Sequence, residues 1–142
     1  MLRGERVRPG DVDVEVATAD GAGAARTLGL PAPIPHDGRG GWSLRTGGEV
    51  NGVRVDLSAG LVITGPGGTL HAGDAPVDRV PGTGGRDAIP LVPMGEALAR
   101  AIVTGSGTRR VAALAALPDE PVARADAIAY AESRAAAARA AR

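Results

Sequence analysis

The fold is decided by residues 47–117, which read GGEVNGVRVDLSAGLVITGPGGTLHAGDAPVDRVPGTGGRDAIPLVPMGEALARAIVTGSGTRRVAALAAL. Short β-branched runs alternate there with Gly, Pro, Asp and Ser, which is typical of short strands joined by tight turns. Residues 53–57 alternate apolar and charged side chains, so they predict a half-buried strand. Residues 65–68, GPGG, predict a turn, and residues 69–71 a return strand.

Residues 95–117 fit two different structures. The run from Glu96 to Val103 has a fair helix propensity, but it would also make a strand. Two runs of similar length flank a Gly-Ser-Gly turn, and this favours a β-hairpin of ARAIV with RRVAAL over a helix-turn-helix.

The region before this stretch begins with a strand signal and then loses all periodicity. Val12, Val14 and Val16 alternate with acidic residues, and Val7 extends the pattern across the turn Arg8-Pro9-Gly10. Residues 21–46 are rich in Gly and Pro, which predicts an extended arm. Trp42 is the natural anchor of such an arm, buried either in the chain's own core or against a neighbouring chain.

The C-terminal region predicts a helix over residues 118–142. Pro118-Asp119-Glu120-Pro121 offers an Asp N-cap and an early Pro, and no glycine follows. The helical stripe is nearly all alanine, so we expect this helix to pack closely or to project into solvent.

These patterns predict a mainly β fold with a C-terminal α-helix. We expect a small antiparallel β-sandwich or barrel-like domain with an extended Gly/Pro-rich N-terminal arm. Residues 1–46 would form the strand and arm, residues 47–117 the β-rich core domain, and residues 118–142 the Ala/Arg-rich helix.

The composition predicts a thin core. The chain has 142 residues and 44% hydrophobic content, but 28 residues are alanine, with one Trp, one Tyr and no Phe. Aromatic side chains usually dominate core energetics. We therefore expect part of the stability to come from a partner surface or an oligomer.

Charge and cysteine content exclude several classes of protein. Sixteen basic residues, all arginine, balance sixteen acidic ones along the chain, which argues against a nucleic-acid partner. The absence of cysteine removes disulfides and cysteine metal sites. The charged N-terminus does not resemble a secretory signal, and the lack of a long apolar run argues against a membrane span.

Candidate chemistry is sparse. No glycine-rich segment, including residues 82–87, completes a nucleotide-binding motif, and no lysine is present for a Walker loop. His36 beside Asp37, and His71 near Asp74, could form a general base or supply metal ligands, although polar turn residues explain both better. We therefore assign no catalytic residue, cofactor or metal.

Partner binding has better candidates. Arg109 and Arg110, with Arg100 across the expected hairpin, form the local basic cluster, for which a solvated face is the simpler interpretation. Together with Trp42, Arg109 and Arg110 are the residues that we expect at a protein partner.

Three segments carry a resemblance to a known class: Val53-Arg54-Val55-Asp56-Leu57, Leu70-His71-Ala72-Gly73-Asp74 and Gly95-Glu96-Ala97-Leu98-Ala99-Arg100-Ala101. In style, residues 47–117 resemble small capsid decoration (cement) proteins of tailed bacteriophages. The resemblance implies a non-enzymatic structural protein of the virion that sits on the outer shell as an oligomer and stabilises it. The alternatives are an accessory or binding subunit of a protein complex in the bacterial cytoplasm and, in another class, a small enzyme using His36 or His71.

Overall fold

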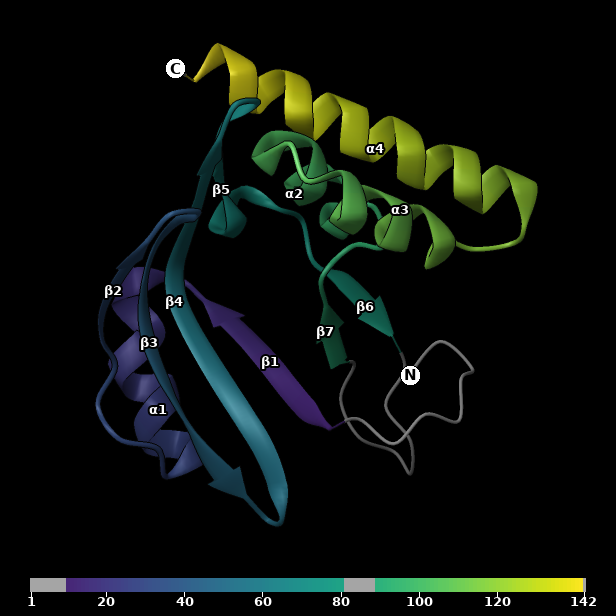
Figure 1. Ribbon diagram of the computed structural model, residues 1–142. Helices are drawn as coiled ribbons and strands as arrows, with labels where there is room; N and C mark the ends of the chain where they lie inside the picture. Colours follow the sequence, from purple (N-terminus) through teal and green to yellow (C-terminus); the bar gives the residue numbers. More distant parts are fainter. Residues whose placement is uncertain (1–9, 81–88, 142) are drawn as a thin grey trace. The chain divides into compact units, whose positions relative to one another are not determined.

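The chain forms two compact units, divided between Leu61 and Val62. The computed structural model describes residues 10–80 and 89–141 (Figure 1). The strand extension at Val7, the turn at Arg8-Pro9 and the glycine-rich loop over residues 81–87 lie outside the described residues.

The first unit is built on a mixed β-sheet. Its elements are β1 (Asp11–Val16), a 3₁₀ turn (Thr18–Asp20), α1 (Gly21–Leu28), β2 (Ile34–Gly38), β3 (Gly41–Val50) and β4 (Val53–Gly65). The strand order is β1-β4-β3-β2, and β1 runs parallel to β4. The prediction of strands with a C-terminal helix is confirmed, but the fold is 43% helical and 34% strand and is therefore not mainly β. The sheet is mixed and open, with β1 and β2 at its edges, so the expected antiparallel sandwich or barrel is not confirmed.

The core of this unit lies between α1 and one face of the sheet. Ala25 and Leu30 pack there against Val55 and Leu57 of β4. Period-2 alternation directs these β4 side chains to one face. The start of α1 approaches the sheet so closely that a Cβ at Gly21 would lie 2.6 Å from the Cβ of Ala59.

The extended arm expected over residues 21–46 is a helix and two strands. Helix α1 ends at Gly29, whose φ of 69° is left-handed, and Leu30 N–H donates to the Ala25 carbonyl at 2.8 Å. This is a glycine C-terminal cap followed by an apolar residue that returns to the core. The segment is ordered because its glycines allow close packing and helix capping, roles that composition does not distinguish from flexibility.

A two-residue turn joins β3 to β4. Asn51 has φ 51° and Gly52 has φ 78°, the two left-handed positions of a type I′ hairpin turn. The dipeptide Asn-Gly between two apolar-alternating runs is a strong hairpin signal. The strand before this turn, β3, was not predicted from the sequence, although this dipeptide signals it.

Replacing Gly52 by alanine should destabilise the first unit by about 1 kcal/mol, because alanine is strained at this positive φ. Nothing lies within 4 Å of a Cβ at this position, so the loss is one of backbone conformation alone. Urea unfolding followed by Trp42 fluorescence measures it. Gly40→Ala, equally open and without a positive φ, should change little; equal losses for the two variants would contradict the turn assignment.

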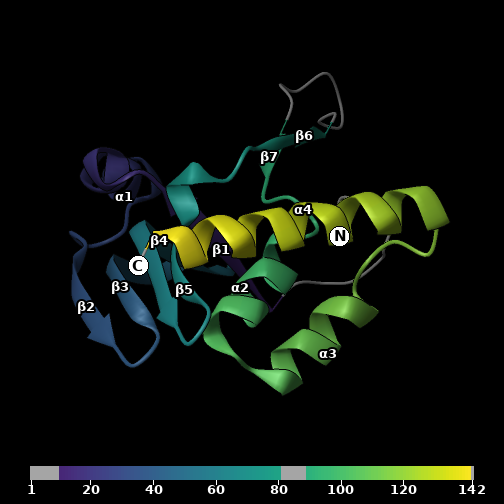
Figure 2. The same ribbon diagram turned by 90° about the horizontal axis from the view of Figure 1, so that it is seen from above.

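The second unit contains the end of β4 and most of the helices. Its further elements are β5 (Gly68–His71), a 3₁₀ turn (Ala72–Asp74), β6 (Asp78–Val80), β7 (Ile89–Leu91), α2 (Glu96–Thr104), α3 (Gly107–Ala115) and α4 (Pro121–Ala140). β5 turns back antiparallel onto β4, as the GPGG turn predicted, and β6 pairs with β7. Helix α2 packs against both α3 and α4 (Figure 2).

The β-hairpin expected over residues 95–117 is wrong, and the segment is a helix-turn-helix. Gly105, with φ 69°, ends α2, and the Ser106 side chain then caps α3 by accepting from the Arg109 N–H at 3.3 Å. A glycine at a helix end followed by a serine N-cap is a helix-to-helix signal. The same residues also suit a turn between two strands. Burial of one face of α2 favours the two helices over the hairpin.

The C-terminal helix is confirmed as α4. Its N-cap is Glu120 rather than Asp119: the Glu120 carboxylate accepts from the N–H groups of Val122 and Ala123 at 3.0 and 2.6 Å. Pro121 occupies the first turn, where no N–H is needed. The helix buries Ala131, Ala135 and Ala138, so its small side chains bring it close to its neighbours.

Candidate functional site

The face of the first unit's sheet opposite α1 carries a cleft. Alternation along the strands directs the charged residues of β1 and β4 away from the core, opposite the valines and leucines that meet α1. The cleft has a volume of about 550 Å³. Its lining includes Asp13, Glu15, Ile34, His36, Arg45, Asp56 and Ser58, drawn from all four strands. This volume lies in the range of ligand- and peptide-binding pockets.

Side chains of both charges are held in place in and beside this cleft. Arg54 pairs with Asp56 two residues along β4 at 3.1 Å, on the same face of the strand. Arg45 donates its Nε proton to Oγ of the fully buried Ser43 at 2.9 Å, which fixes the direction of the guanidinium. The cleft therefore offers a partner both an oriented cation and carboxylates.

The two histidines occupy different places. His36 lies in the cleft on β2, where the side chain makes no hydrogen bond or ion pair with the described residues. His71 lies at the end of β5 with an exposed side chain. Within residues 10–80 and 89–141, no three His, Asp or Glu side chains are grouped closely enough to hold a metal ion.

Trp42 lies at the start of β3, opposite Asp37 of β2. The sequence predicted burial of Trp42 in the chain's own core or against a neighbouring chain. In the structure, 36% of its surface is exposed, so it is not buried in the chain's own core. One edge of the indole approaches Gly60, where a Cβ would lie 3.4 Å from Cζ3. The ring therefore rests on the sheet while offering an apolar surface to solvent.

The basic cluster lies on helices instead of a hairpin. Arg109 and Arg110 are exposed in the first turns of α3. Arg100 and Arg109 nevertheless line one groove of about 410 Å³ between α2 and α3. The rest of its lining is alanine: Ala97, Ala101, Ala112, Ala113 and Ala116.

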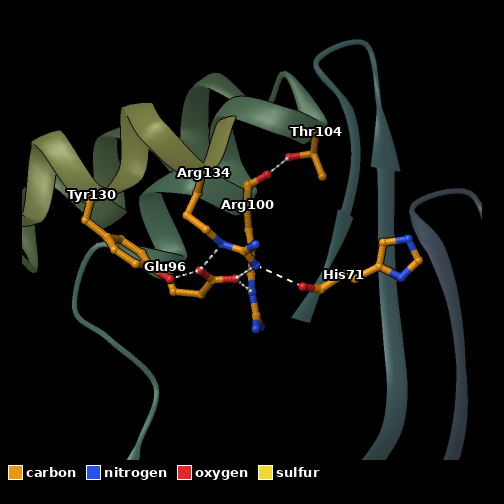
Figure 3. A network of polar contacts seen from close by, with 6 residues as sticks. All are labelled: His71, Glu96, Arg100, Thr104, Tyr130 and Arg134. Atoms are coloured by element: carbon orange, nitrogen blue, oxygen red, sulfur yellow. Dashed lines mark hydrogen bonds and ion pairs between the residues drawn. The ribbon is translucent and has the colours of Figure 1, made fainter. Parts of the chain in front are cut away.

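A buried carboxylate organises the second unit, and sequence reasoning missed it. Glu96, the first residue of α2, is fully buried. Tyr130 of α4 donates its hydroxyl proton to Oε2 at 2.7 Å, and Arg134 donates from Nε to Oε2 and from Nη2 to Oε1, both at 3.2 Å. Arg100 donates to Oε1 at 3.3 Å (Figure 3). The carboxylate thus has a donor on each oxygen and a paired charge, which a buried ion requires.

Close backbone approach makes this network possible. A Cβ at Gly95 would lie 2.8 Å from Cδ1 of Tyr130 and would also meet the Ala127 carbonyl, so only glycine lets α4 come this near. Arg134 also donates from Nη2 to the His71 carbonyl at 2.9 Å. One arginine therefore ties α4 to α2 and to the end of β5. The Glu96–Arg100 spacing of four residues was readable from the sequence, but the partners on α4 were not.

The environment shifts the ionisation of the network. Burial alone would raise the pKa of Glu96, but hydrogen bonds from Arg134 and Tyr130 and the charges of Arg134 and Arg100 outweigh it, so the pKa lies below the ordinary 4.5. Partial burial and the hydrogen bond to Glu96 raise the pKa of Tyr130, which stays a proton donor. The network therefore holds Glu96 as an ionised carboxylate whose side chain is closed to solvent.

The lowered pKa of Glu96 predicts acid sensitivity. A carboxylate with a folded pKa below its unfolded value stabilises the protein fully above the unfolded value, here 4.5, and loses that contribution as the pH falls through the folded pKa. The stability difference between the wild type and Glu96→Gln should therefore stay constant from about pH 7 to about pH 5 and shrink as the pH falls further. Urea unfolding at several pH values measures it. A constant difference would show that folding does not shift the pKa of Glu96, and a difference that grows as the pH falls would show that folding raises that pKa.

In comparisons with known proteins, no family model, no curated protein and no solved structure matches this chain. In the part of the chain that the structure describes, none of the helices has the length and apolar character needed to cross a membrane.

Proposed function

We propose that this chain is a non-enzymatic structural protein that binds a larger protein assembly and stabilises it. The observation that carries the proposal is the cleft on the sheet face of the first unit opposite α1, lined by charged side chains of both signs from four strands. Such a surface is suited to a segment of another protein, because paired and oriented charges give specificity to protein contacts.

An apolar anchor accompanies the charges. Ile34 lines the cleft and is 68% exposed, on the edge strand β2. A protein partner that covers this side chain with apolar surface would gain binding free energy from its burial. The partner is therefore a protein segment that offers an apolar side chain to Ile34 and charged side chains to the cleft.

A viral capsid is the assembly that we propose for this role, with the chain as a decoration protein on its outer shell in the virion. The alanine-rich composition supports this, because it leaves few large apolar side chains for a core. Such a chain gains stability from the surface to which it binds.

A second function, an accessory subunit with one partner in a bacterial complex, is favoured by Trp42. A partly exposed tryptophan supported by the sheet is the kind of side chain that dominates single protein interfaces. His36 makes no hydrogen bond or ion pair with a carboxylate among the described residues, so no observation here favours the third alternative, a small enzyme that uses this histidine.

Site-specific photo-crosslinking of the full chain in its own host tests the proposal. A photoreactive residue at position 34 should form an adduct with one protein, and a residue at Thr27, exposed on α1, should not. Arg45→Glu should weaken the adduct at position 34, because it reverses the oriented charge of the cleft. Adducts that sediment with particles of capsid size support decoration, and adducts in a complex with one partner support the accessory subunit.

Equal adducts at positions 34 and 27, or no protein adduct at position 34, would overturn the proposal. An adduct with a small metabolite in place of a protein would also overturn it and identify the cleft as a small-molecule site.

A further inference from the structure

The groove between α2 and α3 combines small apolar side chains with positive charge. Five alanines form its floor and walls, and Arg100 and Arg109 stand in its lining. Alanine side chains let another helix approach closely, since interaxial distance depends on the side chains at the contact. The two cations make the groove favourable to a helix with an acidic side chain.

The two arginines differ in what they contact. Arg100 donates to the buried Glu96, so its charge is already partly satisfied. The side chain of Arg109 makes no hydrogen bond or ion pair with the described residues and is exposed. The charge left to recognise an occupant is therefore that of Arg109.

Of the described α-helices, only α4 carries exposed acidic side chains, Asp126 and Glu132. Glu132 lies within a stripe of exposed residues at helical spacing, Ala125, Ala129, Glu132 and Ala136. Glu132 makes no hydrogen bond or ion pair with the described residues. The stripe thus presents one unpaired carboxylate among alanines, which complements one unpaired guanidinium among alanines.

The opposite face of α4 is already used. Ala131, Ala135 and Ala138 are buried within the unit, so the stripe at Glu132 points away from α2. A chain cannot bring this stripe to its own groove without dismantling the Glu96 network that holds α4.

We propose that the α2/α3 groove is a docking site for the outer stripe of α4 of a second copy of this chain, with an ion pair between Arg109 and Glu132. The contact joins two different surfaces, so it is heterologous, and repetition produces a ring or an open chain of copies. This inference goes beyond the proposed function, because it concerns contact between copies and does not depend on what the cleft of the first unit binds.

Sedimentation velocity of the full chain over a wide range of concentration tests the proposal. The wild type should self-associate, and Arg109→Glu or Glu132→Arg should each weaken association about tenfold or more, because each places like charges at the contact. The double variant Arg109→Glu/Glu132→Arg should associate as the wild type does. An equimolar mixture of the two single variants should also associate, since each supplies the surface that the other lacks.

Circular dichroism shows whether each variant keeps its helices. Arg39→Glu makes the same charge change at an exposed turn of the first unit and should leave association unchanged. The proposal is overturned by a monomeric wild type, which would leave an acidic helix of another protein as the occupant. Association of both single variants at wild-type strength, or failure of both the mixture and the double variant to associate, would overturn it as well. None of these outcomes affects crosslinking at position 34, so the two proposals fail separately.

Discussion

Replacing Glu96 by alanine should cost the protein about 3 kcal/mol or more of its free energy of unfolding, because it leaves buried donors without their shared acceptor. Arg134, whose side chain is 14% exposed, loses its ion pair, and Tyr130 and Arg100 lose hydrogen bonds. The cost exceeds that of an exposed ion pair because the remaining charges stay away from water. Urea unfolding followed by circular dichroism at the helical band, to which α2, α3 and α4 contribute, measures the loss.

Two further variants separate the charge from the packing. Glu96→Gln keeps the shape and can still accept hydrogen bonds, so it should lose less stability than the alanine variant while removing the charge that opposes Arg134. Asp126→Ala removes a carboxylate from the exposed face of α4 and should change stability little. If Glu96→Ala were no more harmful than Asp126→Ala, the network would not hold the second unit together.

Replacing Gly68 by alanine should destabilise the second unit by about 2 kcal/mol or more, from strain and overlap together. Gly68 begins β5 at a φ of 117°, a conformation that alanine adopts only with strain. A Cβ at this position would also meet the carbonyl group of Ala138 in α4, which is backbone and cannot rotate away as a flexible side chain could. The last turns of α4 would have to move off the β4–β5 hairpin.

Gly73→Ala provides the matched control, because Gly73 has no positive φ and nothing lies within 4 Å of a Cβ there. It should be close to neutral. Hydrogen exchange of the amides in the last turns of α4 should quicken in Gly68→Ala and not in Gly73→Ala. Unchanged exchange and unchanged stability in Gly68→Ala would show that the hairpin and the helix end do not touch closely.

The glycines show how one residue type can support opposite interpretations. Gly21 permits contact of α1 with Ala59, Gly95 permits contact of α2 with Tyr130, and Gly68 permits contact of β5 with α4. From composition alone, such positions indicate turns and a flexible arm. Glycine is needed both in turns and at close contacts between elements. Only the position of the opposing atoms in the fold shows which of the two roles a given glycine has.

Some features of the candidate sites were predictable from the sequence, and others depend on the fold. The grouping of Arg100 with Arg109 was expected from a hairpin and occurs between two helices, in the α2/α3 groove. The charged face of the first unit follows from the alternation in β1 and β4, which was visible in the sequence. The cleft on that face forms because four strands lie side by side, and their order in the sheet was not visible in the sequence.

The sequence by itself determined the elements whose signals are local. Alternation specifies β1 and β4, GPGG specifies the β4–β5 turn, and an early Pro with an unbroken Ala/Arg run specifies α4. The tertiary structure decided that residues 96–115 form α2 and α3, because burying one face of α2 against α4 outweighs a weak local preference. It also decided the role of Glu96, whose main partners lie 34 and 38 residues away. Periodicity and turn chemistry act between near neighbours, whereas a buried charge is stable only where the fold brings its donors to it.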